Sequence, residues 1–342
     1  MRALVKPRPG PGLELVDRPK PIVGPNDVAI AVKRAAICGT DLHIFDWDDW
    51  AASEVVTPVT VGHEFFGVVD AVGDQVKSVA VGERVAGEGH VTCGTCRNCR
   101  AGRQHLCRNT IGVGIHRNGG FADLVAIPVS NVYRVPDEIQ DNAAAVLDPL
   151  GNAVHTTLSF DLVGEDVLIT GAGPIGQMAA GVARVAGARH VVVTDTVEER
   201  RTIALRMGAS RAVEPGTESL QAAMSELGMR EGFDVGLEMS GHPAALDDMV
   251  SVINHGGRIA LLGLYGRRPD VDMNTLIFKG LTVKGIYGRE MFETWYKATG
   301  LLTSGLDVSP VISHVLPLED FDEAFDLVRT GRASKVIFDL EA

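Results

Sequence analysis

The chain has 342 residues, and its 44 acidic and 32 basic side chains give it a formal net charge of -12. This length predicts about two domains, and a content of 45% hydrophobic and 22% charged residues is typical of a globular protein rather than a disordered one. The acidic total argues against nucleic-acid binding and against binding to an anionic membrane surface. No apolar run is as long as a membrane-spanning helix, and the N-terminus has prolines and charges where a signal peptide needs an apolar segment. We therefore expect a cytoplasmic protein.

Residues 1–145 are predicted to form a β-rich domain. Short apolar, β-branched runs such as DVAIAVKRAAI, GVVDAVG, GERVAG and FADLVAIP are separated there by glycine and proline, and no helical period dominates. Four of the five cysteines of the chain, Cys93, Cys96, Cys99 and Cys107, lie within fifteen residues of this region. A secreted disulfide framework would have an even number of more widely spaced cysteines, so we interpret the cluster as a metal site.

The spacing C-x2-C-x2-C-x7-C favours a closed, tetrahedral, structural zinc site in a lobe at about residues 88–112. The main alternative is an iron–sulfur cluster. The bacterial ferredoxin motif has three residues before its last cysteine and a proline after it, whereas this chain has seven residues there and Arg108 follows.

A second group of possible metal ligands lies earlier in the same region. Cys38, Asp41 and His43 form the motif C-G-T-D-L-H, and Gly62-His63-Glu64 follows. A thiolate, an imidazole and a carboxylate can hold zinc with one position open for substrate. No spacing rule joins Cys38 to His63, and each residue has an ordinary structural alternative: a lone cysteine is commonly buried, and His-Glu is a common polar turn.

From Asp148 to about residue 290, strands alternate with helices, which predicts a doubly wound parallel sheet. The strand candidates are VLIT, VVVTD, FDVGLEMSG, GRIALLG and GLTVKGIYG. Residues 291–342 contain a strand (HVLPL), a helix starting at Glu319 or Asp320 and a strand (KVIFDL). The residues alone do not decide whether this segment extends the sheet or returns to the first domain.

The turn after the first of these strands has the sequence Gly171-Ala-Gly173-Pro-Ile-Gly176, which fits G-x-G-x-x-G between a strand and a helix. This pattern predicts a dinucleotide site in which Gly171 allows the tight turn, Gly173 lets pyrophosphate approach the backbone and Gly176 allows close helix packing. Asp195, nineteen residues beyond Gly176, is placed to bind the ribose hydroxyls and to repel a 2′-phosphate, which favours NAD over NADP. The alternative is an ordinary glycine turn with Asp195 as a helix cap. Arg200 is predicted to lie beside the adenine or ribose, or else to be an exposed helix residue.

The motifs C-G-x-D-x-H, G-H-E, the four-cysteine lobe and the late glycine turn occur in this order in the zinc-dependent medium-chain alcohol dehydrogenases, and the chain resembles that family over essentially its whole length. The segments GEGHVTCGTCRNCRAGRQHLCRNTIGVG, DPLGNAVHTTLSFDLVGEDVLITGAGPIG, GFDVGLEMSG and KGIYGREMFETWYK are most similar to its threonine-oxidising members. The resemblance implies an α/β protein with a GroES-like catalytic domain (1–147), a Rossmann NAD-binding domain (148–290) and a return segment (291–342) that completes the first domain.

The resemblance also implies a role for individual residues. They are Cys38, His63 and Glu64 as catalytic zinc ligands; Cys93, Cys96, Cys99 and Cys107 as structural zinc ligands; Thr40 and His43 as a proton relay; Asp148 as a residue that tunes the catalytic site; His90 beside the substrate; and Gly171, Gly173, Ile175, Gly176, Asp195, Arg200, Leu262, Gly263, Leu264, Ile286 and Tyr287 around the cofactor. One departure from the family is the bulky, basic loop Leu264-Tyr-Gly-Arg-Arg268, which leaves the nicotinamide-side contacts open.

The implied activity is NAD-dependent oxidation of the 3-hydroxyl of L-threonine to 2-amino-3-oxobutanoate by a homotetramer with two Zn²⁺ per chain, one catalytic and one structural. Asp46, Asp48 and Asp49 offer negative charge for the substrate ammonium, although a solvated acidic loop is the better explanation for any one of them. A polyol or 2,3-butanediol dehydrogenase of the same family is an alternative, since it would share every zinc and cofactor residue. An alternative from another class is a non-catalytic, NAD-binding zinc protein, which would not need Cys38, Thr40, His43 and His63 together.

Overall fold

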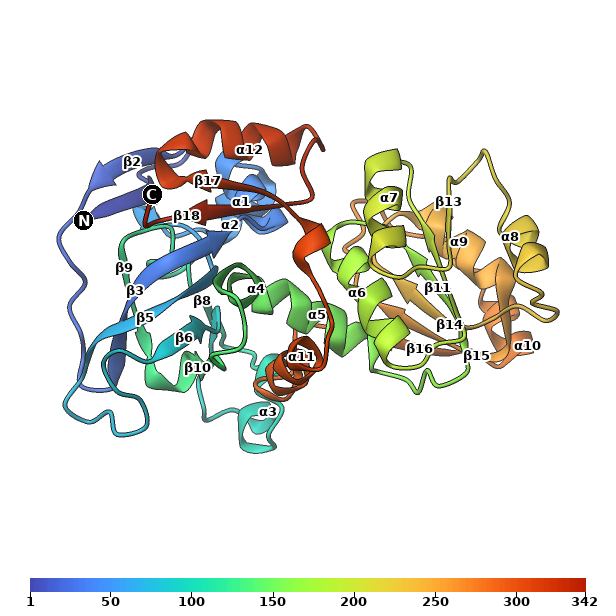
Figure 1. The fold of residues 1–342 in the computed structure, drawn as a ribbon, viewed down its shortest axis with the longest axis horizontal. Helices are drawn as coiled ribbons and strands as arrows, with labels where there is room; N and C mark the ends of the chain where they lie inside the picture. The colour runs from blue at the N-terminus through green and yellow to red at the C-terminus, as the bar shows by residue number, and fades with distance from the viewer. The chain divides into compact units, whose positions relative to one another are not determined.

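The computed structural model describes residues 1–342, which divide into two units: Met1–Asp148 with Ile312–Ala342, and Pro149–Val311 (Figure 1). None of its helices is both long enough and apolar enough to cross a membrane. The final segment joins the first unit at Ile312, later than the residue 291 expected from the sequence. The reason is that α11 (Glu293–Thr303) belongs to the second unit, where its Trp295 is buried and lies 6.0 Å from the Arg289 guanidinium.

The first unit is built on a seven-stranded sheet in the order β10-β6-β5-β3-β18-β17, with β9 also paired to β3. Strand β18 runs antiparallel to β3, with Phe338 opposite Ala35, so the end of the chain returns to the N-terminal sheet. Two smaller sheets, β2-β1-β4 and β7-β8, complete the unit. Its elements are β1 (Arg2–Lys6), β2 (Glu14–Asp17), β3 (Asp27–Ala36), α1 (Gly39–Asp46), α2 (Asp49–Glu54), β4 (Val59–Thr60), β5 (Glu64–Val72), β6 (Arg84–Gly87), β7 (His90–Val91), α3 (Arg97–Arg100), η1 (Gln104–Leu106), β8 (Ile111–Gly112), β9 (Leu124–Pro128), η2 (Val129–Asn131), β10 (Val132–Arg134), α4 (Asp141–Ala145), β17 (Ile312–Pro317), η4 (Leu318–Asp320), α12 (Phe321–Arg329) and β18 (Lys335–Asp339).

The second unit is a six-stranded parallel sheet in the order β13-β12-β11-β14-β15-β16, the doubly wound arrangement expected from the alternating strands and helices. Helices α6 and α7 cover one face, and α9 and α10 cover the other (Figure 1). All five residues of β11 are buried, as a strand covered on both faces requires. Its elements are β11 (Asp166–Thr170), α6 (Pro174–Val185), β12 (His190–Thr194), α7 (Glu198–Arg206), β13 (Arg211–Val213), α8 (Leu220–Glu226), β14 (Phe233–Glu238), α9 (Pro243–Val252), β15 (Ile253–Leu261), α10 (Met273–Lys279), β16 (Thr282–Gly285), α11 and η3 (Ser309–Val311), while α5 (Leu147–Thr157) begins at the unit boundary.

Each unit has its own hydrophobic core. The core of the first unit includes Phe65 and Phe121 from the N-terminal region together with Phe325 and Phe338 from the final segment. Phe121 and Phe338 meet edge to face with their ring centroids 5.1 Å apart. The return of the chain is therefore stabilised by burial of apolar surface as well as by strand pairing.

Candidate active site and metal centres

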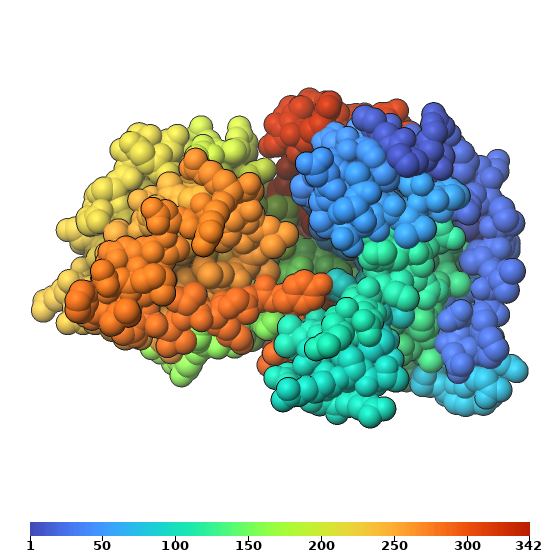
Figure 2. Space-filling view, turned by 180° about the vertical axis from the view of Figure 1, so that it is seen from behind, coloured from blue at the N-terminus to red at the C-terminus, as the bar shows by residue number.

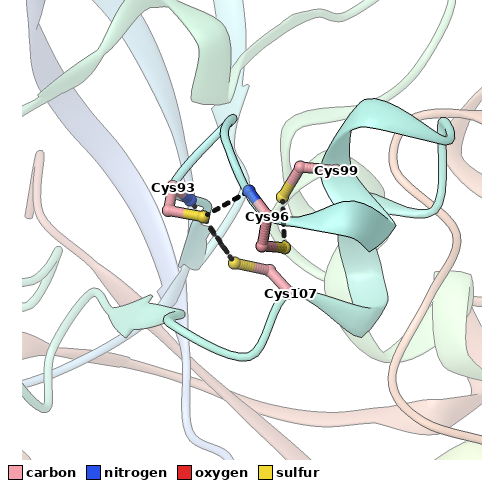
Figure 3. Close-up of side chains that lie close together, drawn as sticks. All are labelled: Cys93, Cys96, Cys99 and Cys107. Carbon is pink, nitrogen blue, oxygen red and sulfur yellow. Dashed lines mark hydrogen bonds between the residues drawn. The ribbon is translucent and has the colours of Figure 1, made fainter.

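The four cysteines of the predicted lobe converge on one point in the first unit (Figure 3). Their sulfur atoms all lie within 4.8 Å of one another, and the Sγ pairs Cys96–Cys99 and Cys93–Cys107 are each 3.5 Å apart. Cys96 is the N-cap residue of α3, which places Cys99 on the first turn facing it. Residues 93–107 form a rounded projection on the surface of the first unit (Figure 2). Four converging sulfur donors on a short irregular lobe fit a closed tetrahedral zinc site.

Backbone amides in the lobe favour a thiolate at Cys93. Bonds from the N–H groups of Thr95 and Cys96 lower the pKa of Cys93 to about 5, and the N–H of Cys96 lies 3.4 Å from its sulfur. Burial instead raises the pKa of the Cys99 thiol to about 12. Because a zinc ligand must be a thiolate, Cys99 needs a bound cation to be deprotonated at neutral pH, whereas Cys93 does not.

Cys38, His63 and Glu64 also come together, although the sequence spacing could not join them. Their ligand atoms lie within 4.8 Å of one another. Cys38 caps α1 just after strand β3, and His63 directly precedes β5, which begins at Glu64. Strands β3 and β5 pair with Ala36 opposite Glu64, and this pairing brings the two motifs side by side. One sulfur, one nitrogen and one oxygen donor fit a zinc site that has an open fourth position.

Two charged side chains surround this cluster and hold its members. Asp41 is fully buried, accepts the Cys38 N–H at 2.9 Å and has its second oxygen 3.6 Å from His63 Nδ1, an atom with no hydrogen-bond partner. Lys335, from β18, is 4% exposed and donates to Glu64 Oε2 at 2.7 Å and to the Ile37 carbonyl at 2.9 Å. Asp41 was predicted from the sequence only as one member of the motif C-G-T-D-L-H among the possible metal ligands, and Lys335 was not predicted to take part in the site. The sequence did hold a signal for Lys335, since a lysine begins the apolar strand KVIFDL. A buried charge requires a partner, so this lysine could have been predicted to face an acidic residue.

Negative charge is concentrated at this cluster. Burial alone would lower the pKa of His63, but the Asp41 carboxylate and the Cys38 sulfur raise it well above its ordinary value. Burial raises the pKa of Glu64 and Asp148 raises it further, against the opposing effect of Lys335. Asp148, at the start of α5, is 5% exposed, and its charge raises the pKa of both Glu64 and Lys335. A buried group of anions with two cations is an environment that a metal ion would stabilise.

Of the predicted relay and substrate residues, Thr40 and His43 lie on α1, which begins next to Cys38, and His90 lies in β7. Thr40 Oγ1 is 3.8 Å from Cys38 Sγ. His43, one helical turn further along α1, is 58% exposed and places Nδ1 2.5 Å from Asp48 Oδ2. His90, in β7, has its Nδ1 3.2 Å from the buried Glu88 carboxylate.

The second unit has a cavity of about 560 Å³ at the carboxyl ends of its strands. Four residues predicted to bind the cofactor line it: Gly171, Gly173, Asp195 and Arg200. Arg200 Nη1 is 4.0 Å from Asp195, and its buried Nε has no hydrogen-bond partner. A carboxylate and a guanidinium with an unsatisfied N–H fit the hydroxyls of a ribose.

The glycine turn has the geometry that its sequence predicts. Gly171 has φ +90°, a conformation that other residues rarely adopt, and a Cβ on Gly176 would lie 2.0 Å from the Gly171 carbonyl oxygen. Gly173 has no atom within 4 Å of the position of a Cβ, so its backbone is open to a ligand at the N-terminus of α6. Asp195 accepts the Ala172 N–H at 2.8 Å and the Val197 N–H at 2.8 Å. This aspartate therefore also holds the glycine turn.

The other predicted cofactor residues do not line this cavity. Ile175 and Gly176 lie in the first turn of α6, Leu262 and Gly263 follow β15, Leu264 is 96% exposed, and Ile286 and Tyr287 follow β16. Their contacts with a cofactor stay predictions. The cavity instead includes Met239, Ser240 and His242, which the sequence analysis missed. The signal that could have found them is their place just after strand β14, because ligands of doubly wound sheets bind at the carboxyl ends of the strands.

The unusual loop after β15 is attached to the sheet by its tyrosine. Tyr265 donates its hydroxyl to Glu238 Oε2 at 3.0 Å, and burial together with this carboxylate raises its pKa. Glu238 is fully buried at the end of β14 and also accepts the N–H groups of Ser240 (2.9 Å) and Gly241 (3.0 Å). Tyr265 thus connects the loop to the segment that forms one wall of the cavity.

Known proteins match both units. Residues 24–137 match the alcohol dehydrogenase GroES-like domain, and residues 174–304 match the zinc-binding dehydrogenase family. The chain is 58% identical over 341 residues to an L-threonine 3-dehydrogenase of Vibrio parahaemolyticus serotype O3:K6, with 100% of this chain and 99% of that protein covered. It is 58% identical over 340 residues to an L-threonine 3-dehydrogenase of Anaeromyxobacter sp. strain Fw109-5, with 99% of each covered.

Solved structures agree with this assignment. A protein described as a short chain alcohol dehydrogenase of E. coli CFT073, in complex with NADH, is 28% identical, with a TM-score of 0.90 and 99% of each chain covered. A zinc-binding dehydrogenase of Sinorhizobium meliloti 1021 bound to NADP is 29% identical, with a TM-score of 0.90, and 99% of this chain and 98% of that one are covered. The chain therefore belongs to the zinc-dependent medium-chain alcohol dehydrogenases and, within them, to the L-threonine 3-dehydrogenase family.

Proposed function

We propose that this chain is an NAD- and zinc-dependent L-threonine 3-dehydrogenase that converts L-threonine to 2-amino-3-oxobutanoate. The observation that carries the proposal is 58% identity over the whole chain to proteins of that activity. The convergence of Cys38, His63 and Glu64 supports it, because this donor set leaves a coordination position for a substrate hydroxyl. A non-catalytic NAD-binding protein would have no use for that arrangement.

The residues of the chain have distinct tasks in this reaction. Cys38, His63 and Glu64 would hold the catalytic zinc, and Asp148 and Lys335 set the charge around them. When bound, zinc supplies Lewis-acid polarisation of the hydroxyl, and NAD accepts the hydride. Thr40 and His43 give the proton of the hydroxyl a path to solvent, since Thr40 lies beside Cys38 and the exposed His43 ends the path. We assign His90 to the substrate pocket.

The proposal is tested by substrate screening. Purified protein should reduce NAD with L-threonine at a far higher kcat/KM than with sorbitol or 2,3-butanediol. A higher kcat/KM with either diol would reassign the enzyme to the polyol or butanediol dehydrogenases. Absence of turnover with all three substrates, in protein that holds both zinc ions, would favour the non-catalytic alternative.

We further propose that the cofactor is NAD rather than NADP. The Asp195 carboxylate lies on the cavity wall, where it would repel a 2′-phosphate. Asp195→Asn removes the charge and keeps one oxygen for the Ala172 N–H, so it should narrow the preference for NAD while the protein stays folded. Equal kcat/KM of the unaltered enzyme with NAD and NADP would remove this role from Asp195.

Each chain is proposed to bind two zinc ions, one in each cluster. Elemental analysis of purified protein should give two zinc atoms per 36.4 kDa chain. An iron absorption spectrum from the anaerobically purified protein would instead favour the iron–sulfur alternative for the four-cysteine lobe. The proposed cytoplasmic location agrees with five cysteines that form no disulfide.

The homotetramer is a proposal as well, supported by the surface of the second unit. Strand β16 is a sheet edge with all four residues exposed, and the nearby helix α10 exposes Ile277 (69%) and Phe278 (80%). An exposed edge strand beside apolar side chains is suited to symmetric pairing with a second copy. Light scattering should give a mass of four chains, and Phe278→Arg should reduce it, whereas the control Val81→Arg, on the first unit, should not.

A further inference from the structure

The relay histidine has a carboxylate partner that the sequence motif does not include. His43 Nδ1 lies 2.5 Å from Asp48 Oδ2, and the second oxygen of Asp48 accepts the Ala51 N–H at 2.9 Å. Asp48 is the N-cap residue of α2, so one oxygen is committed to the helix and the other to the imidazole. The Ala51 N–H and then His43 hold the pKa of Asp48 below its usual value, so the carboxylate is ionised.

The surrounding backbone forces this contact. Trp47 has the left-handed conformation (φ 58°, ψ 53°) at the end of α1, and this turn brings Asp48 back toward His43. The Trp47 and Asp48 N–H groups both point at the His43 carbonyl, at 2.9 and 3.4 Å. Asp48 is therefore fixed to His43 by main chain and side chain together.

A buried lysine holds Trp47 in place. The Lys6 ammonium lies 4.8 Å from the centre of the Trp47 ring, donates to the Gly12 carbonyl at 2.9 Å and also donates to the Gly10 carbonyl. Gly12 in turn donates its N–H to the Phe45 carbonyl at 2.7 Å, and Lys6 is fully buried. The Trp50 ring also meets the His43 imidazole edge to face, at an interplanar angle of 63° with the centroids 6.0 Å apart. Such an arrangement restricts rotation of both the ring and the carboxylate.

We propose that Asp48 is a positioning residue that keeps the proton of neutral His43 on Nδ1 and thereby leaves Nε2 free to accept the relayed proton. A carboxylate can only accept a hydrogen bond, so the nitrogen that faces Asp48 must carry the hydrogen. Nε2 takes up the proton that leaves the substrate hydroxyl, and the imidazolium returns that proton to water. Asp48 keeps its charge throughout and transfers no proton. The proposal rests on the proposed function, because it assumes that His43 ends the relay.

Asp48→Asn tests the proposal with almost no change in size. Because one side-chain oxygen remains bound to the Ala51 N–H, the new NH₂ group faces His43 Nδ1 and reverses the hydrogen bond. The neutral imidazole then carries its hydrogen on Nε2, the wrong tautomer for accepting a proton. We expect kcat for threonine oxidation to fall by about 10–100-fold, at the lower end of the range for acid–base groups because His43 acts away from the reacting bond. KM for threonine and NAD should stay within about twofold.

Asp48→Ser separates positioning from helix capping. Serine caps helices well but is too short to bind the Ala51 N–H and His43 at once. A residue that only capped α2 would be replaced by serine without loss of kcat, whereas the proposal expects kcat to fall. Glu54→Gln removes one charge at the other end of α2, away from His43, and serves as the matched control with unchanged kcat.

A second measurement needs no turnover. Imidazole ¹⁵N shifts of His43, assigned by their loss in His43→Asn, report which nitrogen carries the hydrogen at mildly alkaline pH. The expected result is a protonated Nδ1 in the unaltered protein and a protonated Nε2 in Asp48→Asn. A protonated Nε2 in the unaltered protein overturns the proposal even if threonine is oxidised, and the NMR result stands even if threonine is not the substrate. A higher KM for threonine with unchanged kcat in Asp48→Asn would also overturn the proposal. Such a change would mean that Asp48 binds the substrate ammonium rather than positioning His43.

Discussion

The two clusters of potential metal ligands in the first unit differ in the number and the kind of their donor atoms. The four-cysteine lobe takes all its potential ligands from residues 93–107 (Figure 3), would leave no position open on a tetrahedral ion and lies on a surface projection (Figure 2). The cluster of Cys38, His63 and Glu64 has three ligands of three kinds, brought together by the pairing of β3 and β5 and surrounded by buried charges. A closed set of like donors suits a structural ion, and an open set of unlike donors suits a catalytic one. A structural and a catalytic zinc site are thus expected to differ in the number of their protein ligands and in the charges around them.

The largest expected effect follows from removing a ligand of the open cluster. Cys38→Ser and His63→Ala should each lose one of the two zinc ions and lower kcat by at least about 10³-fold, because Lewis-acid stabilisation is worth several kcal/mol. NAD affinity, measured by calorimetry, should stay within about twofold, since the proposed cofactor cavity lies in the second unit. If a folded variant loses NAD binding, the separation of the two functions is wrong.

The next effect concerns Lys335, which has no counterpart in the lobe. Lys335→Met leaves the Glu64 carboxylate buried without its cation and should lower the free energy of unfolding by about 3 kcal/mol. Lys335→Arg keeps the charge and should cost about 1 kcal/mol or less. Urea titration measures both, and equal losses in the two variants would show that the shape of the lysine, rather than its charge, is what matters.

Breaking the lobe should affect stability more than chemistry. Cys99→Ser should remove the other zinc ion and lower Tm by roughly 5 °C, because metal binding contributes to folding. The folded fraction should keep its KM for threonine. An unchanged Tm after the zinc is lost would mean that the lobe folds without metal, and the comparison between the clusters would then fail.

The smallest effects are expected from residues next to the ligands. Asp41→Asn disturbs the contact with His63, and Thr95→Val removes a hydroxyl that donates to Cys93 Sγ at 3.6 Å. Asp41→Asn should lower the zinc affinity of the open cluster by about 10–100-fold. Thr95→Val should lower the zinc affinity of the lobe by less than about 10-fold. Titration with a chelator measures both zinc affinities. Loss of activity reports zinc release from the open cluster, and a fall in Tm reports zinc release from the lobe. The reverse order would mean that the buried charges do not tune the open cluster.

The sequence predicts well what depends on short spacing. The four-cysteine lobe, the glycine turn from Gly171 to Gly176 and the alternating strands of the second unit are local patterns, and the structure places each of them as expected. Helix α12 begins at Phe321, just beyond the expected Glu319 or Asp320, because a 3-10 turn precedes it.

Contacts that depend on strand pairing or on one turn were not predictable. Lys335 and Glu64 are 271 positions apart, and only the return of β18 to the N-terminal sheet brings them together. The His43–Asp48 contact depends on the left-handed conformation of Trp47, which sequence rules assign to glycine rather than to tryptophan. Of the seven predicted cofactor residues outside the cavity, Gly176 came from the glycine motif and the other six came from the family resemblance. Their contacts with a cofactor stay predictions.

The place of β18 has a consequence for biosynthesis. A ribosome makes the chain from its N-terminus, so Cys38, His63 and Glu64 emerge long before the strand that carries Lys335. During that interval the nascent first unit lacks both its last two strands and the cation that balances Glu64. Contacts so distant along the chain also form slowly. The emergence of β18 therefore completes the surroundings of the cluster of Cys38, His63 and Glu64, and a chain that stalls before residue 335 is expected to be inactive and a substrate for proteases.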